Sequence, residues 1–134
     1  MNKELYYTPS IEEFHVGFEY EYNNGKSWQN EIFIRGIGFA PNPKLDDCRV
    51  KYLDKEDIES LGWLFEKQHA GLEELQFSKD LGSTYDNLGL DYSLDSGYLR
   101  IAYNGLNGDT TRFSGTIKNK SELKVLMKQL GINE

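Results

Sequence analysis

Two arginines in the last third of the chain, Arg100 and Arg112, stand among hydroxyl-bearing residues at the spacing of β-strands. The alternation over residues 111–117 predicts a strand with one polar and one apolar side. We expect one polar sheet face to carry Tyr98, Arg100, Arg112, Ser114 and Thr116. Guanidinium groups beside hydroxyls suit a phosphate or carboxylate, and a tyrosine ring can stack on a planar ligand. A solvated face whose arginines pair with Asp91 or Asp95 explains the same pattern, and both interpretations stay open.

Residues that could hold a metal or act as catalysts are few and scattered. A zinc site needs several cysteine or histidine ligands at set spacings, and Cys48, His15 and His69 do not provide them. Glu19 and Glu21 would lie about 6 to 7 Å apart on one face of a strand, which is compatible with paired acid–base carboxylates. Charges on the solvated face of a hairpin explain this pair as well. We therefore expect a protein that is not an enzyme and that has neither a metal site nor a cofactor.

The composition is that of an acidic globular protein. The chain has 134 residues and a net charge of −7, and its acidic residues are interleaved with lysines. This charge argues against non-specific binding of DNA or RNA, because clustered lysine and arginine are needed to neutralise phosphates. The single cysteine fits a reducing compartment, and no segment is apolar enough for a membrane span. Together with the polar residues 1–4, these features predict a cytoplasmic protein without membrane contact.

A hairpin is predicted near the N-terminus, because aromatic or aliphatic residues alternate with polar ones over residues 14–22 and a second strand-like run covers residues 28–35. A three-residue loop at 23–25, whose glycine takes the left-handed conformation, would set the register. Tyr20 would then face Trp28, and almost every large apolar side chain would lie on one face.

A second hairpin is predicted from residues 90–94 and 99–103. A two-residue turn at 96–97 would pair Leu94 with Leu99 and gather the apolar side chains of both strands on one face.

Two helices are predicted. The first covers residues 55–67 with Asp54 as its N-cap, and Trp63 lies off its apolar stripe. The second covers residues 120–130 and ends before Gly131, after which the chain can fold back onto the helix. Trp63 would either pack under a loop or serve as an exposed anchor at an interface.

Together these elements predict a single α+β domain over residues 1–134. Its centre would be a mainly antiparallel sheet of about five to seven strands built from hairpins, with the two helices packed on it. An edge strand and apolar surface favour pairing with a second copy of the chain, so a homodimer is a candidate assembly.

Residues 9–21 (PSIEEFHVGFEYE) form the most distinctive segment of the chain, and residues 120–132 (KSELKVLMKQLGI) form its closing helix. In these segments the chain resembles small uncharacterised proteins of Bacteroidota and their phages. The two segments cover under a quarter of the chain. The resemblance implies a short cytosolic accessory protein without a defined activity, and it supplies no site residues.

These observations favour a binding protein over an enzyme. Small phage accessory proteins without a catalytic constellation usually act by binding, and one such role is to sequester a host immune signal. We therefore expect a non-enzymatic ligand-binding protein, of a kind that phages encode, that sequesters a small anionic, nucleotide-like signalling molecule to counter host defence. The alternative is an interaction module that inhibits or adapts a host protein through an aromatic patch including Trp63.

Overall fold

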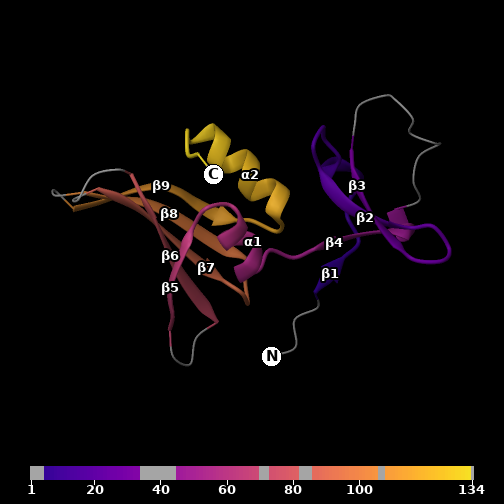
Figure 1. The fold of residues 1–134 in the computed structure, drawn as a ribbon, viewed down its shortest axis with the longest axis horizontal. Helices are drawn as coiled ribbons and strands as arrows, with labels where there is room; N and C mark the ends of the chain where they lie inside the picture. Colours follow the sequence, from indigo (N-terminus) through magenta and orange to yellow (C-terminus); the bar gives the residue numbers. More distant parts are fainter. Residues whose placement is uncertain (1–4, 34–44, 70–72, 82–85, 106–107, 134) are drawn as a thin grey trace. The chain divides into compact units, whose positions relative to one another are not determined.

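The computed structural model describes residues 5–33, 45–69, 73–81, 86–105 and 108–133. These residues form two antiparallel sheets, of four and five strands, and two α-helices (Figure 1). They fall into two compact units: unit 1 is Met1–Tyr52 with Asn119–Ser121, and unit 2 is Leu53–Lys118 with Glu122–Glu134. The α+β class and the mainly antiparallel sheet of about five to seven strands are confirmed, and the structure adds a second antiparallel sheet of four strands. The single domain stays a prediction.

Unit 1 contains the four-stranded sheet, in the order β1-β4-β2-β3. Its strands are β1 (Tyr6–Tyr7), β2 (Glu19–Asn23), β3 (Trp28–Ile32) and β4 (Cys48–Lys51), and two short 3-10 helices cover Ile11–Glu13 and Leu45–Asp47. One face of the sheet carries the buried core of the unit, which consists of Phe18, Tyr20, Cys48 and Val50. The ring of Phe14 packs against this core and lies 5.0 Å from the rings of Phe18 and Tyr20.

The hairpin of β2 and β3 differs from its prediction. Asn23 pairs with Trp28, so the loop has four residues instead of three. The side chain of Asn24 accepts hydrogen bonds from two backbone N–H groups later in the loop, at 2.9 and 3.0 Å, and these bonds stabilise the longer loop. The predicted pairing of Tyr20 with Trp28 is therefore wrong, because Tyr20 faces Glu31.

A late part of the chain contributes to unit 1. Asn119, which is only 2% exposed, donates a hydrogen bond from Nδ2 to the hydroxyl oxygen of Tyr7 at 2.8 Å. Tyr7 in turn donates to Oε1 of Glu13 at 2.6 Å. The backbone N–H of Glu19 donates to Oγ of Ser121 at 3.0 Å. Hydrogen bonds therefore join residues near the start of the sequence to residues 119 and 121.

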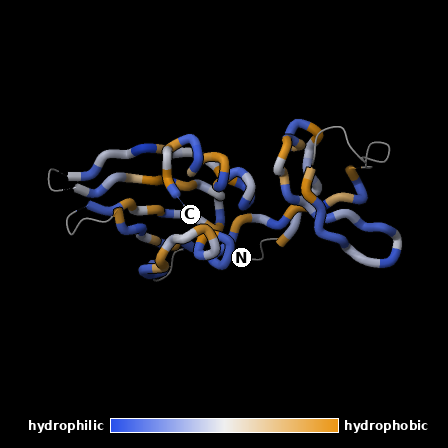
Figure 2. The backbone as a smooth tube through the Cα atoms, turned by 45° about the horizontal axis from the view of Figure 1, so that its top comes forward, coloured by the Kyte–Doolittle hydropathy of each residue, from blue (hydrophilic) through white to orange (hydrophobic). Residues whose placement is uncertain are grey.

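Unit 2 contains the five-stranded sheet, whose strands follow one another in sequence order. They are β5 (Leu64–Gln68), β6 (Glu74–Asp80), β7 (Asn87–Ser93), β8 (Tyr98–Gly105) and β9 (Gly108–Thr116), accompanied by α1 (Lys55–Ser60) and most of α2 (Lys120–Gln129). α2 lies over one face of the sheet (Figure 1), where Leu123, Leu126 and Met127 are buried against the apolar residues of the strands. The alternation of apolar and polar residues along the strands appears as alternating colours in Figure 2. The sheet therefore has a core face and a polar face.

The first helix is shorter than predicted. α1 ends at Ser60, and the chain is already extended in β5 from Leu64 onward. Gly62 has a φ of +93°, which lies outside the helical region and favours glycine. The helix predicted over residues 55–67 is therefore wrong beyond residue 60. Its start is confirmed, because Oδ1 of Asp54 accepts a hydrogen bond from the backbone N–H of Asp57 at 2.9 Å.

The hairpin of β7 and β8 is shifted by two residues from its predicted register. Leu99 pairs with Tyr92 instead of Leu94. Because side chains alternate with a period of two, this shift leaves the same residues on the core face. The apolar face that the sequence predicts is therefore present.

The second helix agrees with its prediction. α2 is followed by Gly131 at a φ of +73°, and the backbone N–H of Ile132 returns to the carbonyl oxygen of Met127 at 2.8 Å. This is the hydrogen bond of a glycine-terminated helix end, and Ile132 packs against the core of unit 2. Within the described ranges, no helix is long and apolar enough to cross a membrane.

Candidate anion-binding surface

The polar face of the five-stranded sheet carries most of the residues that the sequence assigned to it. Leu99 and Ile101 of β8 are buried on the core face, so Tyr98 and Arg100 lie on the polar face. The register of β8 and β9 makes Ser114 the partner of Arg100 and Thr116 the partner of Tyr98. Four of the five predicted residues, namely Tyr98, Arg100, Ser114 and Thr116, are therefore neighbours on one face.

Arg100 is the central cation of this group. Its Nε donates a hydrogen bond to Oγ1 of Thr111 at 3.1 Å, and its Nη1 lies 3.7 Å from Oδ2 of Asp91. The distance to Asp91 is longer than a hydrogen bond, and the arginine side chain is 35% exposed. Among the described residues, neither terminal nitrogen of Arg100 donates a hydrogen bond. The charge of Arg100 is thus partly compensated, and its terminal donors remain available to an oxyanion.

Arg112 does not lie beside Arg100, contrary to the sequence-based expectation. The register of β8 and β9 passes from the pair Ile101–Phe113 to the pair Ala102–Thr111, and Arg112 is the extra residue of the resulting bulge. Its guanidinium group lies 5.5 Å from the centroid of the Tyr103 ring, which packs against the core of unit 2. The bulge therefore removes Arg112 from the group and brings Thr111 to Arg100.

The hydroxyl of Tyr103 is held in its neutral form. A hydrogen bond to the Asp86 carboxylate, followed by burial and by the negative charge of Asp86, raises the pKa of Tyr103, whereas Arg112 acts in the opposite direction. At neutral pH the phenol therefore donates to Asp86, and Arg112 interacts with an uncharged ring.

Trp63 is part of the core of unit 2. It is 3% exposed, and its Nε1–H points at Sδ of Met127 at 3.4 Å. The early end of α1 at Ser60 places Trp63 between the helix and β5, so it is not on a helix at all. The idea of Trp63 as an exposed interface anchor is therefore wrong, and the packing alternative that the sequence left open describes its environment better.

Groups suited to metal binding or nucleophilic catalysis do not come together in the part of the chain that the structure describes. No cluster of three His, Cys, Asp or Glu side chains is found within it. Burial, followed by the charge of Asp47, raises the pKa of Cys48 and keeps its side chain a thiol. Nδ1 of His15 lies 2.9 Å from the backbone oxygen of Glu13.

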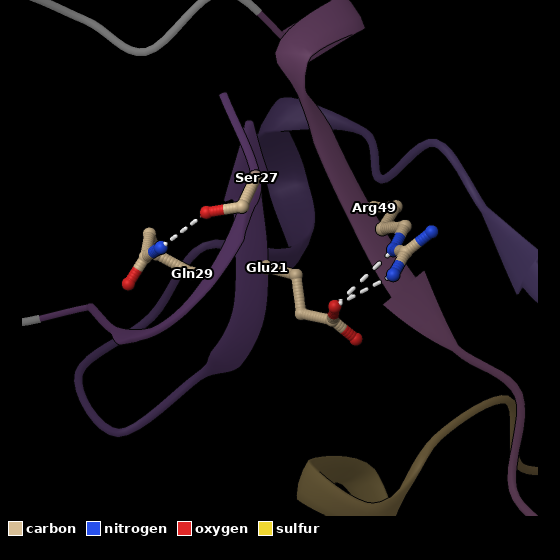
Figure 3. A network of polar contacts seen from close by, with 4 residues as sticks. All are labelled: Glu21, Ser27, Gln29 and Arg49. Carbon is tan, nitrogen blue, oxygen red and sulfur yellow. Dashed lines mark hydrogen bonds and ion pairs between the residues drawn. The ribbon is translucent and has the colours of Figure 1, made fainter. Parts of the chain in front are cut away.

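Arg49 forms a second arginine site, in unit 1, that the sequence analysis did not single out (Figure 3). Its guanidinium group lies 3.8 Å from the ring centroid of Tyr6 and 4.1 Å from that of Trp28. Oε1 of Glu21 accepts hydrogen bonds from Nε and Nη2 of Arg49 at 3.2 and 2.9 Å, as Figure 3 shows. Because Glu21 lies 2.9 Å from Arg49, the charge of Arg49 is compensated more closely than that of Arg100, whose ion pair with Asp91 is 3.7 Å long. No sequence signal could reveal this site, because the four residues lie on four strands.

Breaking this second arginine site should destabilise the protein. We expect Arg49→Ala to lower the free energy of unfolding by roughly 1–3 kcal/mol, because it removes two ring contacts and two charge-assisted hydrogen bonds. Arg49→Lys should recover only part of this loss, since an ammonium group cannot stack flat between two rings. Urea denaturation measures both changes.

The control is Lys55→Ala, which removes an exposed ion pair of 3.1 Å with Glu59 and one ring contact, in which Nζ lies 4.5 Å from the Phe65 centroid. The expected loss is at most about 0.5 kcal/mol. Equal losses for the Arg49 and Lys55 variants would contradict a stabilising role of the stacked arginine.

The fold and this surface define a small α+β protein with a polar sheet face on which Arg100 lies 3.7 Å from Asp91. Comparison of the chain with protein-family models, with curated proteins and with solved structures finds no match. Its function must therefore be inferred from its own residues.

Proposed function

We propose that this protein binds a small anionic, nucleotide-like molecule without transforming it chemically. The observation that supports the proposal is the environment of Arg100. Its ion pair with Asp91 is 3.7 Å long, and the hydroxyl groups of Thr111 and Ser114 lie beside it. The guanidinium group of Arg100 can direct two parallel N–H bonds to a phosphate, while the hydroxyls of Thr111 and Ser114 offer further contacts. Tyr98 is exposed on the same face and can contact a planar ring.

The biological role that fits this chemistry is capture. The resemblance of residues 9–21 to small proteins of Bacteroidota and their phages favours sequestration of a host signalling molecule as a means to counter defence. A cytoplasmic location and a homodimer remain predictions of this proposal. The alternative of an interaction module loses Trp63 as its anchor, because Trp63 is buried, and it stays a prediction.

The proposal is tested by comparing the nucleotide affinities of two arginine variants. Arg100→Gln should weaken binding of nucleoside mono-, di- and cyclic phosphates about 10- to 100-fold, because it removes a charge-assisted contact. Arg112→Gln should leave binding unchanged, because Arg112 lies over Tyr103 and apart from Arg100. Isothermal titration calorimetry with a panel of these nucleotides measures both affinities, and native mass spectrometry gives the stoichiometry per oligomer.

Flat titrations of the unmodified protein across the panel would refute the capture function. Binding that depends on Arg112 and not on Arg100 would refute the site while keeping the function. Thermal unfolding of each variant shows whether a loss of binding reflects a loss of fold.

A further inference from the structure

Arg100 presents one pair of charged donors to an anion. Its Nε is already used, because it donates to Oγ1 of Thr111 at 3.1 Å. The two parallel N–H bonds that a guanidinium group directs to a phosphate must therefore come from Nη1 and Nη2. Thr111 and Ser114 are exposed beside Arg100 and can add hydroxyl contacts, but hydroxyl groups carry no charge. The group of residues therefore offers a ligand one positive charge.

Asp91 lies close to any ligand that uses these donors. It is the cross-strand partner of Arg100, and its Oδ2 lies 3.7 Å from Nη1. An oxygen that accepts a hydrogen bond of about 2.9 Å from Nη1 therefore lies within about 6.6 Å of Oδ2. The side chains of Arg100 and Asp91 are only 35% and 31% exposed, so water screens the carboxylate in part. Asp91 must therefore repel an anion that is bound to Arg100.

The polar face brings no second cation close to Arg100. The row of residues that crosses the sheet at this point is Ser114, Arg100, Asp91, Gln76 and Lys67. Lys67 is three strands away from Arg100, which corresponds to about 14 Å and exceeds the screening length of about 8 Å at physiological ionic strength. Arg112 lies over the ring of Tyr103, which packs against the core. Among the described residues of these strands, the charge of a bound anion is therefore balanced by Arg100 alone.

This balance suits a phosphate with one negative charge better than a phosphate with two. The attraction to a single guanidinium group grows in proportion to the charge of the ligand, whereas the cost of removing the ligand from water grows with the square of that charge. Repulsion by Asp91, and by a protein of net charge −7, also grows with each added charge. A phosphate monoester carries about −1.5 to −2 charges at neutral pH, and a diester carries one.

We infer that Arg100 and Asp91 together select nucleotides whose phosphate is a diester, cyclic or linear, over nucleotides that end in a phosphate monoester. Arg100 binds the phosphate, and Asp91 is the residue that determines the specificity for charge. This inference rests on the proposed function, because it specifies the ligand of the same face. It adds a condition on the charge of the phosphate that the proposed function does not make.

Three compounds with the same nucleoside test the inference in the unmodified protein. Adenosine, adenosine 5′-monophosphate and the methyl ester of that monophosphate are titrated calorimetrically into the full 134-residue protein. At about pH 7.5 the monophosphate is mostly doubly charged and its methyl ester singly charged. The methyl ester should bind about three- to tenfold more tightly than the monophosphate, and adenosine should bind most weakly.

The outcomes of this comparison separate the inference from the function on which it rests. If neither phosphate binds, or if neither binds more tightly than adenosine, the proposed function fails, and the inference fails with it. If the monophosphate binds as tightly as the methyl ester or more tightly, while both exceed adenosine, the proposed function stands and the selection for a diester is overturned.

Asp91→Asn tests the role of the carboxylate. The amide keeps the shape of the side chain and an oxygen opposite Arg100, but it removes the negative charge. Because the repulsion is proportional to the charge of the ligand, the doubly charged monophosphate should gain about twice as much binding free energy as the ester. We expect the affinity for the monophosphate to rise about tenfold and that for the methyl ester about threefold, so that the preference for the ester is reduced or lost.

The control variant is Glu56→Gln, which removes one negative charge at an exposed position of α1. This helix packs into the core of unit 2 through Ile58, so the control should change neither affinity by more than about twofold. Equal gains for both ligands in Asp91→Asn, a loss for both, or the same gains in Glu56→Gln would overturn the role of Asp91. Thermal unfolding shows that both variants are folded, and the comparison in the unmodified protein does not depend on either variant.

Discussion

Replacing Trp63 with alanine is expected to lower the free energy of unfolding by about 3–5 kcal/mol. The indole is buried in the core of unit 2, and its Nε1–H is directed at Sδ of Met127. Truncation would remove the packing contacts of the ring and leave a cavity that the surrounding strands can fill only in part. Urea denaturation followed by circular dichroism measures the loss.

The control for this variant is the next residue in the chain. Leu64 is 66% exposed, and Leu64→Ala should change the stability by no more than about 0.5 kcal/mol. If Trp63→Ala were as stable as the unmodified protein but changed its oligomeric mass, Trp63 would be an interface residue, and its burial within unit 2 would be contradicted.

Phe18→Ala is expected to cost a similar amount, about 3–5 kcal/mol, in unit 1. The Phe18 ring lies 5.0 Å from that of Phe14 and 5.9 Å from that of Tyr20, so its removal empties the centre of an aromatic cluster. The chain has two tryptophans, Trp28 in unit 1 and Trp63 in unit 2. Because a single domain unfolds cooperatively, both fluorophores should report the same lowered midpoint.

The fluorescence of each tryptophan is measured separately in two single-tryptophan variants, one with Trp28→Phe and the other with Trp63→Phe. Val16 is 63% exposed and close to Phe18 in sequence, so Val16→Ala serves as the control and should leave the midpoint nearly unchanged. Two distinct midpoints in the Phe18→Ala protein would show that the units unfold separately, and the prediction of one domain would be wrong.

The registers of the two hairpins show which part of the fold is encoded locally. In both hairpins the alternation of apolar and polar residues identified the strands. The loop lengths depend on side-chain hydrogen bonds within the loops, and the alternation gives no information about these bonds. In the hairpin of β2 and β3, Asn24 bonds to the later loop residues and shifts the register by an odd number, which exchanges the partners across the two faces. In the hairpin of β7 and β8 the register shifts by an even number of residues, so the predicted residues still lie on the apolar face.

The sequence likewise predicted some of the residues at the candidate site and missed others. Alternation on β8 and β9 placed Arg100, Ser114, Tyr98 and Thr116 on one face, and the register confirms this placement. The bulge at Arg112 has no mark in the sequence, because any residue can occupy such a position, and it exchanged Arg112 for Thr111 beside Arg100. The hydrogen bond from Asn104 of β8 to Asn87 of β7 likewise depends on which residues of the two strands face each other, and the sequence alone does not determine this register.

Gly62 indicated the end of the first helix in the sequence, but the helical spacing of apolar residues favoured a longer helix. Apolar residues at helical spacing continued past it, and they favoured a helix to residue 67. A glycine that ends one helix is a common feature, and here its positive φ redirects the chain into β5. Trp63, the residue immediately after Gly62, consequently enters the core instead of the helix surface.

The hydrogen bonds that join Asn119 to Tyr7 and Ser121 to Glu19 bear on when the protein can fold during its synthesis. The ribosome makes residues 1–52 first, yet unit 1 is incomplete until residues 119–121 have left the exit tunnel. Unit 2 has the same requirement, because its core includes Leu123 and Met127. Neither unit can therefore complete its fold before the segment that contains residues 119–127 has been synthesised, and until then the aromatic residues of unit 1 lack these partners. Folding of both units is therefore governed by contacts between residues that lie far apart in the sequence.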